Sequence, residues 1–517
     1  MGRPGDIAKR IYFRNLLRSA GGLRSAACAA CAAFLLLGCG PDRRVEARAA
    51  ILANRPDDAR QAINAHYKHR TSEDGEDDKR LDASRHLLLW RLERAAIELN
   101  AGRPLAALDH LQEASRLARE ARTRSASRAL SAAVVNDNLT RWTGEAPELV
   151  RIPAYGLLAH LTVMQAAAGI VPGERNPERA DLHADRAASA ALALADQLQR
   201  LRDGEFGSDS YHDDAWLHVL AAIGLHAVAA TADDQETVRL FATRAEEAYA
   251  KSGGMPSVVG RLLPRLRGEA TPPPGYGSII ILEDAGWAPL RQALSLTIVT
   301  AAPGNRRSGI DLGGVFIVVD GPGREHLNPL TGLILPGSLI RDLTRGSFGV
   351  FGCDIPVLPP LGAPSRLGQV EQTSLEAVDD IAGKVHRAFM DGQKRRVAAI
   401  IVRTAVKLIA ARQGVNAVQA AGDRKHRAES EAVGNILWFL LSGLIRVSEQ
   451  ADTRCWSLLP GRTGAALLDV PAGLTTVTVQ AGDGSQRTFS GIQVEAGRMV
   501  VLTVRSFPQG TAVPERK

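Results

Sequence analysis

The chain has 517 residues, of which 45% are hydrophobic, 23% charged and only 4% aromatic. This length predicts two to four domains, because a domain usually takes about 100–200 residues, and the composition excludes collagen, low-complexity disorder and a small disulfide-rich protein. The formal net charge is +7, but residues 1–38 carry +5 of it. Since a nucleic-acid interface needs a basic stripe on a folded domain, we expect no nucleic-acid partner.

The N-terminal segment 1–38 is typical of a lipoprotein signal peptide. A basic region precedes the apolar run 26–37, which is shorter than the roughly 20 residues that span a membrane. The run ends in Leu36-Leu37-Gly38-Cys39, which resembles the bacterial lipobox. That resemblance implies cleavage between Gly38 and Cys39 and acylation of the Cys39 thiol, palmitate included. The alternative is a chance cysteine at the end of an ordinary signal. Gly40 favours the outer membrane, with the chain facing the periplasm.

Residues 39–252 are predicted to form an α-helical domain, because they are dense in Ala, Leu, Arg and Glu and hold few β-branched runs. Helical pairs are also expected at 177–191 and 215–249. We therefore predict either a stack of helical repeats or an irregular helical bundle. Both arrangements offer surface to partners more than a reaction centre.

The stretch 102–114 resembles the second half of a tetratricopeptide repeat. Gly102 would form the turn between two helices, and Pro104 would begin the second helix, where its missing N–H costs little. The small Ala107 and Ala114 would let the two helix backbones approach closely. This segment therefore predicts a tetratricopeptide-like N-terminal half.

The Pro- and Gly-rich segment 253–277 is predicted to be a linker. A mixed α/β domain is expected over 278–460, with strands at 278–282, 294–299 and 315–319. Two helices separated by Asp391-Gly392 are expected between residues 372 and 412. The apolar run 436–445 is too short to span a membrane and predicts a buried helix.

The C-terminal region 461–517 changes to the two-residue alternation of β-strands. Its strands are expected at 474–479, 492–494 and 499–504, with a turn at 482–484. The fold class is therefore predicted to be α+β, with a helical first half, a mixed α/β centre and a small antiparallel β-region.

Several short blocks resemble, in the same order, a family of uncharacterised proteobacterial outer-membrane lipoproteins. They lie at 142–148, at 280–289, at 355–358 with 403–407, and at 451–460 with 470–473. The resemblance implies an outer-membrane lipoprotein with a tetratricopeptide-like front half and no assigned activity. Two residues depart from the family pattern, since Cys455 stands where a small residue such as Ser is expected and Trp142 where Tyr is expected.

No phosphate-binding loop, hydrolase nucleophile elbow or zinc-protease motif is present, so no catalytic residue, cofactor or metal site is predicted. Tyr211-His212-Asp213-Asp214 are consecutive and cannot all face one ion. Glu376, Asp379 and Asp380 share one helical face only in part, and a solvated first turn of a helix explains them.

Within 451–460 we single out Asp452, Arg454 and Trp456. An architectural role would have Asp452 cap a turn, Arg454 pair with a buried carboxylate and Trp456 pack between domains. The functional alternative makes this block part of a groove that recognises an envelope ligand.

The mature chain also holds Cys353 and Cys455. Because the periplasm is oxidising, they could form one disulfide, and the alternative is two separate buried thiols.

The sequence thus predicts a lipid-anchored, non-catalytic envelope protein that acts as a protein-interaction scaffold or accessory factor, with an envelope protein as partner. The alternative is a periplasmic enzyme or ligand-binding module acting on cell-wall components. A cleft between the halves with perturbed carboxylates would favour the alternative, whereas an apolar concave helical surface without such a cleft would favour the scaffold. Exposed aromatic side chains near Trp456 would favour a binding module in the C-terminal β-region.

Overall fold

The computed structural model describes residues 42–67, 83–123, 141–207, 210–229, 231–300, 310–311, 315–318, 350–371, 373–420, 437–438, 441, 445 and 450–507. Gly38, Cys39 and the predicted signal peptide lie outside these residues. Helices and sheets are both present, so the predicted α+β class is confirmed.

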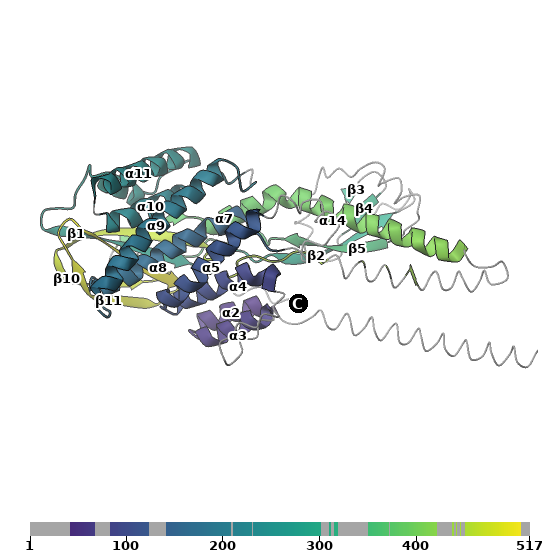
Figure 1. Ribbon diagram of the computed structural model, residues 1–517, viewed down its shortest axis with the longest axis horizontal. Coiled ribbons are helices and arrows are strands. Elements are labelled where there is room, and N and C mark those ends of the chain that lie inside the picture. Colours follow the sequence, from purple (N-terminus) through teal and green to yellow (C-terminus); the bar gives the residue numbers. More distant parts are fainter. Residues whose placement is uncertain are drawn as a thin grey trace, which may run out of the picture.

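The first half of the described chain is a layer of helices (Figure 1). Consecutive helices pack against each other, α2 with α3, α4 with α5, α8 with α9 and α10 with α11. Gly102, at a φ of 69°, forms the turn between α4 and α5, and Ala107 and Ala114 are fully buried. The helices are α2 (Arg43–Leu52), α3 (Pro56–His66), α4 (Ala83–Asn100), α5 (Pro104–Thr123), α7 (Ala146–Leu149), α8 (Arg151–Ala167), α9 (Pro177–Arg202), α10 (Ala215–Val228), α11 (Ala232–Ser252) and α12 (Ser257–Leu266).

The central sheet has the strand order β12-β1-β9-β8, formed by Met499–Ser506, Tyr276–Ala285, Arg462–Pro471 and Glu376–Asp379. β1 is parallel to β12 and antiparallel to β9. Alternate side chains of a strand point to opposite faces. Ile280 and Leu282 accordingly pack against the helices, whereas Ile279 and Ile281 pack against a second sheet. The central sheet is therefore the middle of three layers.

The second sheet has the order β11-β10-β6-β7, formed by Gln486–Val494, Gly473–Gln480, Gln369–Val370 and Thr373–Ser374. Glu283 of β1 lies fully buried beneath it and accepts hydrogen bonds from the N–H groups of Gly368 (2.6 Å) and Gly482 (2.7 Å). A Cβ at Gly482 would lie 1.9 Å from the Arg366 carbonyl oxygen, so only glycine fits there. One buried carboxylate thus fixes two loops of the second sheet.

A third sheet, β3-β4-β2-β5, forms a lobe that extends beyond this body (Figure 1). Its strands are Ile310–Asp311, Val315–Val318, Gln292–Thr300 and Val350–Val357. The 40-residue helix α14 (Ile381–Ala420), about 60 Å long at 1.5 Å per residue, runs from the body into the lobe. No helix in the described part of the chain is long and apolar enough to cross a membrane.

Three predictions of chain organisation differ from the structure. The segment 253–277 is not a plain linker, because α12 buries Val259 and Leu263 in the core of the helical layer. The two helices expected on either side of Asp391-Gly392 are one helix, α14, since glycine does not break a helix whose faces are packed. Of the strands in 461–517, β9 and β12 share the central sheet with β1, whereas β10 and β11 pair with β6 in the second sheet, so this region is not separate. Of the predicted helix 436–445, the four described residues are helical and half-buried.

The predicted strands at 278–282, 294–299, 315–319, 474–479, 492–494 and 499–504 are confirmed, with β4 ending at Val318 and β11 beginning earlier, at Gln486. Each was indicated by a β-branched apolar run or by two-residue alternation.

Several histidines of the helical layer are held neutral by their surroundings. Burial, together with neighbouring positive charge, lowers the pKa of His66 and of His160 to about 4 and that of His110 to about 3. The unfolded chain has a histidine pKa of about 6.5. Between pH 6.5 and about 4 the unfolded chain therefore binds protons that the folded chain does not, and the stability present above pH 6.5 is lost as the pH falls.

We predict that the free energy of unfolding decreases as the pH falls from about 6.5 to 4. Replacing His66, His110 and His160 together by Gln should flatten this slope, measured by urea denaturation followed by circular dichroism. His212→Gln, at an exposed position, is the matched control for the replacement of a histidine by glutamine. An unchanged slope in the triple variant would contradict the assignment.

Candidate functional site

A cluster of buried charges joins the helical layer to the central sheet. Arg151 of α8 lies 2.7 Å from a carboxylate oxygen of Asp379 on β8 and 3.3 Å from one of Asp214, the N-cap of α10. The Nζ of Lys384 donates to Asp379 (2.5 Å) and to Asp214 (2.7 Å), and the Tyr211 hydroxyl donates to Asp214 (2.6 Å). The cluster thus balances two cations against two carboxylates.

The electrostatics of this cluster favour its ionised form. Burial alone would raise the pKa of Asp214, but Lys384 and Arg151 hold it at about 2. The two partner carboxylates raise the pKa of Arg151 well above its ordinary value, although burial opposes this. Because each charge has an opposite charge within hydrogen-bond distance, the desolvation cost of burial is compensated.

A second polar group, next to this cluster, centres on Asp284 at the end of β1. Thr463 donates to Asp284 (2.8 Å), the Tyr155 hydroxyl is also hydrogen-bonded to it, and a guanidinium nitrogen of Arg505 lies 3.5 Å away. Burial raises the pKa of Asp284, although Arg505 opposes the increase. The Arg505 guanidinium lies 5.1 Å from the centre of the Tyr155 ring, a cation–π contact.

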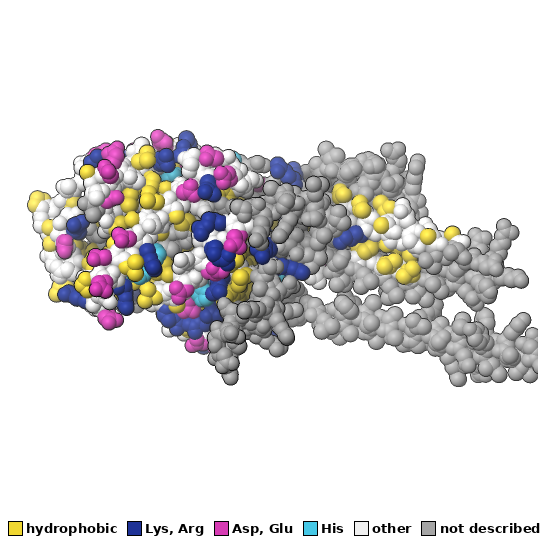
Figure 2. All heavy atoms as spheres, viewed as in Figure 1, with side chains coloured by type: hydrophobic (Ala, Val, Ile, Leu, Met, Phe, Trp, Pro, Cys, Tyr) yellow, Lys and Arg dark blue, Asp and Glu magenta, His cyan; other side chains and the backbone are white. Residues whose placement is uncertain are grey.

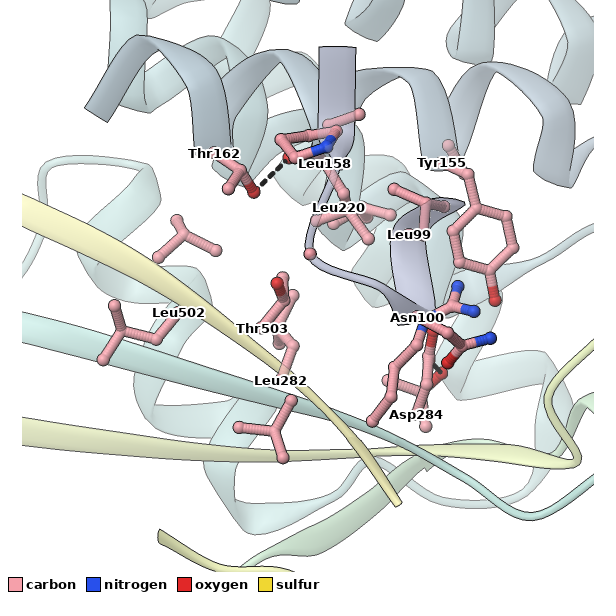
Figure 3. A pocket seen from close by; sticks show the side chains of 18 of the residues that line it. Leu99, Asn100, Tyr155, Leu158, Thr162, Leu220, Leu282, Asp284, Leu502 and Thr503 are labelled. Carbon is pink, nitrogen blue, oxygen red and sulfur yellow. Dashed lines mark hydrogen bonds and ion pairs between the residues drawn. The ribbon is translucent and has the colours of Figure 1, made fainter. Parts of the chain in front are cut away.

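A cavity of about 710 Å³ lies between the helices and the central sheet and is bounded at one side by these two polar groups. Figure 3 shows Leu158 and Thr162 of α8 facing Leu282 of β1 and Thr503 of β12 across it. Its walls are mostly apolar, formed among others by Leu99, Ala154, Ala159, Trp216, Leu217, Leu220, Val501 and Phe489. The exposed residues Arg487, Thr488 and Ser490 of β11 also line the cavity, so it meets solvent beside this strand.

Two buried polar atoms of the cavity-lining residues have no hydrogen-bond partner. They are Nη1 of Arg505 and Oδ1 of Asn100. An unpaired buried polar atom costs roughly 1–3 kcal/mol, so both atoms would gain from a ligand or a bound water molecule. Within the described residues, no cluster of His, Cys, Asp or Glu could hold a metal ion. The mostly apolar walls and the two unpartnered polar atoms suit an organic molecule with an apolar body and a polar end.

The predicted candidates Asp452, Arg454 and Trp456 do not line this cavity. The Asp452 carboxylate accepts hydrogen bonds from the backbone N–H and the guanidinium of Arg454, two residues away in the chain. Trp456 is 3% exposed and packs edge-on against Tyr155 at a ring distance of 5.7 Å. Because its ring is buried, Trp456 offers no aromatic surface to a ligand.

The segment 451–460 has no regular secondary structure, and buried charges from the helical layer bind its backbone. Glu93 of α4 accepts from the N–H groups of Ser457 (2.7 Å) and Leu458 (3.0 Å). Arg48 of α2 donates to the carbonyl oxygen of Ser457 (2.9 Å).

Two further charged side chains of the helical layer also bind the backbone of segment 451–460. Glu148 of α7 accepts from the N–H of Trp456 (2.7 Å), and Arg44 of α2 donates to the carbonyl oxygen of Thr453 (2.8 Å). The helical layer thus holds a segment of its own chain through the backbone of that segment.

Cys353 and Cys455 are both buried and do not form a disulfide. Cys353 lies on β5 in the core between the third sheet and α14, whereas Cys455 lies in segment 451–460, where Arg44 contacts its sulfur at 3.7 Å. The two thiols belong to different parts of the fold. They are therefore two separate buried thiols, the alternative to a disulfide.

The residues of the charge cluster were not identified from the sequence. Glu376 and Asp379 lie on strand β8 rather than on a solvated helix turn, and only Asp380 precedes the first residue of α14. Asp214 and Tyr211 of the 211–214 run belong to the buried cluster, a role that their consecutive positions do not indicate. A usable signal was Asp214 directly before an apolar helix, the position of an N-cap.

No protein-family model, curated protein or solved structure matches this chain. The resemblance to the proteobacterial lipoprotein family therefore stays a prediction from short blocks of sequence.

Glu93→Ala should destabilise the protein by about 2–5 kcal/mol, because it leaves the N–H groups of Ser457 and Leu458 buried without an acceptor. Glu93→Gln keeps one acceptor and should cost less. Chemical denaturation of both variants measures the difference, with the exposed Glu247→Gln as control.

The effect of Glu93→Gln should also depend on pH. Burial raises the pKa of Glu93 from its ordinary value of 4.5 to about 7, although Ser457 and Leu458 oppose this. Protonation of Glu93 therefore stabilises the folded protein fully below about pH 4.5, and this stabilisation is lost as the pH rises through 7. The stability difference between the native protein and Glu93→Gln should decrease from pH 5 to 8, and a constant difference would show that Glu93 does not titrate there.

Proposed function

We propose that this chain is a lipid-anchored, non-catalytic protein of the cell envelope that binds a small ligand between its helical layer and its central sheet. The observation that carries this proposal is the cavity of about 710 Å³. Small-molecule sites usually measure about 300–1,000 Å³ and combine mostly apolar walls with a few polar groups. Both features are present here.

The arrangement of the charged side chains favours binding over catalysis. Asp379 is committed to Arg151 and Lys384, and Asp284 is bound within its own polar group. A general acid or base needs direct hydrogen-bond access to the proton that it transfers. Here the carboxylates use their oxygen atoms on partners within the protein. The cleft itself and the raised pKa of Asp284 are features that support the enzyme alternative.

The scaffold hypothesis receives less support than ligand binding. The inner face of the helical layer, which we propose to be tetratricopeptide-like, packs on the central sheet and on segment 451–460. A protein partner would have to use other surfaces. On the face in Figure 2 the apolar side chains of the body are interrupted by charged ones, and exposed leucines such as Leu182 and Leu240 need no partner to explain them.

The proposed anchor would hold the body close to the membrane. Asp42 caps α2 through a 3.0 Å hydrogen bond to the N–H of Arg44, and Arg44 and Arg48 bind α2 to segment 451–460. Asp42 follows Cys39 by three positions, which allows at most about 11 Å between their Cα atoms at 3.8 Å per step. We therefore propose an outer-membrane lipoprotein that faces the periplasm, with α2 at the membrane-proximal side of the body.

The anchor prediction is tested by growing cells with radiolabelled palmitate. The native chain should become labelled, whereas Cys39→Ser should not, because the thiol that carries the lipid is absent. Cys31→Ser, in the predicted signal peptide, is the matched control and should keep the label. Label on Cys39→Ser would exclude this anchor and leave the cavity proposal untouched.

Ligand binding is tested with the mature chain 39–517 carrying Cys39→Ser, which needs no detergent and keeps every residue that the structure describes. The neutral dye N-phenyl-1-naphthylamine should increase in fluorescence when it enters the cavity. Thr503→Trp should abolish the increase, because Thr503 is exposed, lies on β12 and faces the cavity (Figure 3).

Thr476→Trp is the matched control, since Thr476 is an exposed strand residue of the second sheet that does not line the cavity. This variant should bind the dye as the native chain does. Equal dye binding by Thr503→Trp and the native chain, with both proteins folded by circular dichroism, would overturn the proposed function.

A further inference from the structure

The cavity is polar at one side and apolar over the rest, and this division follows from the central sheet. On the face toward the helices, Ile280 and Leu282 of β1 are apolar, whereas the next inward-facing residue, Asp284, is charged. Arg505 of β12 lies beside Asp284 in the register of the two strands. A ligand that matches both parts must have an apolar body with its polar group at one end.

The apolar walls favour an aliphatic body. They are built mainly from leucine, alanine and valine of α4, α8, α10 and β12, and the aromatic rings of Trp216 and Phe489 are in the minority. A flexible alkyl chain can follow a wall of this kind without any specific ring-to-ring geometry. Among the polar side chains of these walls, Thr162 and Gln165 already form hydrogen bonds with backbone groups of the protein. A sugar or a peptide would compete for these bonds and leave hydrogen-bonding groups buried without partners, which disfavours both.

The charge at the polar side favours an anion. Arg151 and Asp379 neutralise each other within the buried charge cluster, so the remaining charged residues that line the cavity are Asp284, Arg505 and Arg487. Two arginines face one carboxylate. Nη1 of Arg505 is buried without an acceptor, and a guanidinium N–H bonds a carboxylate or phosphate oxygen more strongly than a neutral one.

From these contacts we propose that the ligand is an amphiphile with an aliphatic chain and a single anionic head, and that Arg505 binds the head while the chain lies between α8 and the central sheet. A fatty acid and a monoalkyl phosphate share this chemistry. Oδ1 of Asn100, the second unpartnered atom, would accept a hydrogen bond from a hydroxyl or a protonated oxygen of the head. This inference rests on the proposed function, because it names the ligand class of the same cavity.

The experiment measures how four ten-carbon compounds displace N-phenyl-1-naphthylamine from the mature chain with Cys39→Ser. Decanoate and decyl phosphate carry anionic heads, 1-decanol is neutral, and decylammonium is cationic. We expect both anions, or one of them, to displace the dye at concentrations about tenfold to a hundredfold lower than 1-decanol, the range that one charged hydrogen bond supports. The order of decanoate and decyl phosphate distinguishes a fatty acid from a phosphate ester.

Two variants test which arginine causes the preference for anionic compounds. Arg505→Gln should remove the preference for anions and leave the displacement by 1-decanol unchanged. Arg487→Gln changes an exposed side chain, so it should fold as the native chain does and reduce the preference only in low salt, where long-range attraction is unscreened. If Arg505→Gln does not fold, the order of the four compounds on the unmodified cavity still decides the result.

Equal displacement by 1-decanol and by the anions, or stronger displacement by decylammonium, would overturn the anionic head and leave the cavity proposal standing. Dye binding that persists in Thr503→Trp would instead overturn the proposed function, because the site would then lie elsewhere. An anion preference retained by folded Arg505→Gln would overturn the role of Arg505.

Discussion

The fold depends on one constraint, that charges buried in the helical layer must find partners outside it. Arg48, Glu93 and Arg151 are each at most 7% exposed, and each is bound by the C-terminal half. A buried charge without a partner costs several kcal/mol. The helical layer alone would leave such groups unpaired, so we infer that the layer and the central sheet fold as one unit. The central sheet itself joins distant parts of the chain, because Ser278 of β1 pairs with Asp469 of β9 and with Met499 of β12, 191 and 221 residues away.

Local patterns predicted the elements well, since each strand or helix is encoded within a few residues. Ile279 to Leu282 indicated β1, and Gly102 with Pro104 indicated the turn between α4 and α5. Long-range partnership was not predictable in this way. The run 253–277 has the Pro and Gly content of a linker, but the hydrophobic face of α12 within it, including Val259 and Leu263, is buried by helices that precede it in the chain.

The candidate site was missed for a related reason. Its polar side is built from Arg151, Asp284, Asp379 and Arg505, which lie on four elements spread over more than 350 residues. No spacing rule connects them, because strand order rather than sequence distance brings them together. Segment 451–460 was noticed for its Asp, Arg and Trp, but the structure uses its backbone as much as those side chains. Backbone groups are common to all residues and leave no signature in a sequence.

The cavity lies between the apolar part and the polar part of the interface that joins the helical layer to the central sheet. Away from the cavity, leucine and alanine side chains of the helices pack on the central sheet at Ile280, Ala465 and Leu467. At the end of β1 the two neighbouring acids face opposite sides, and Glu283 is satisfied by two loops of the second sheet. Asp284 faces the helices, where a charged group needs polar neighbours instead of close apolar packing. The space between that polar end and the packed apolar region accommodates a molecule that is itself apolar along its length and charged at one end.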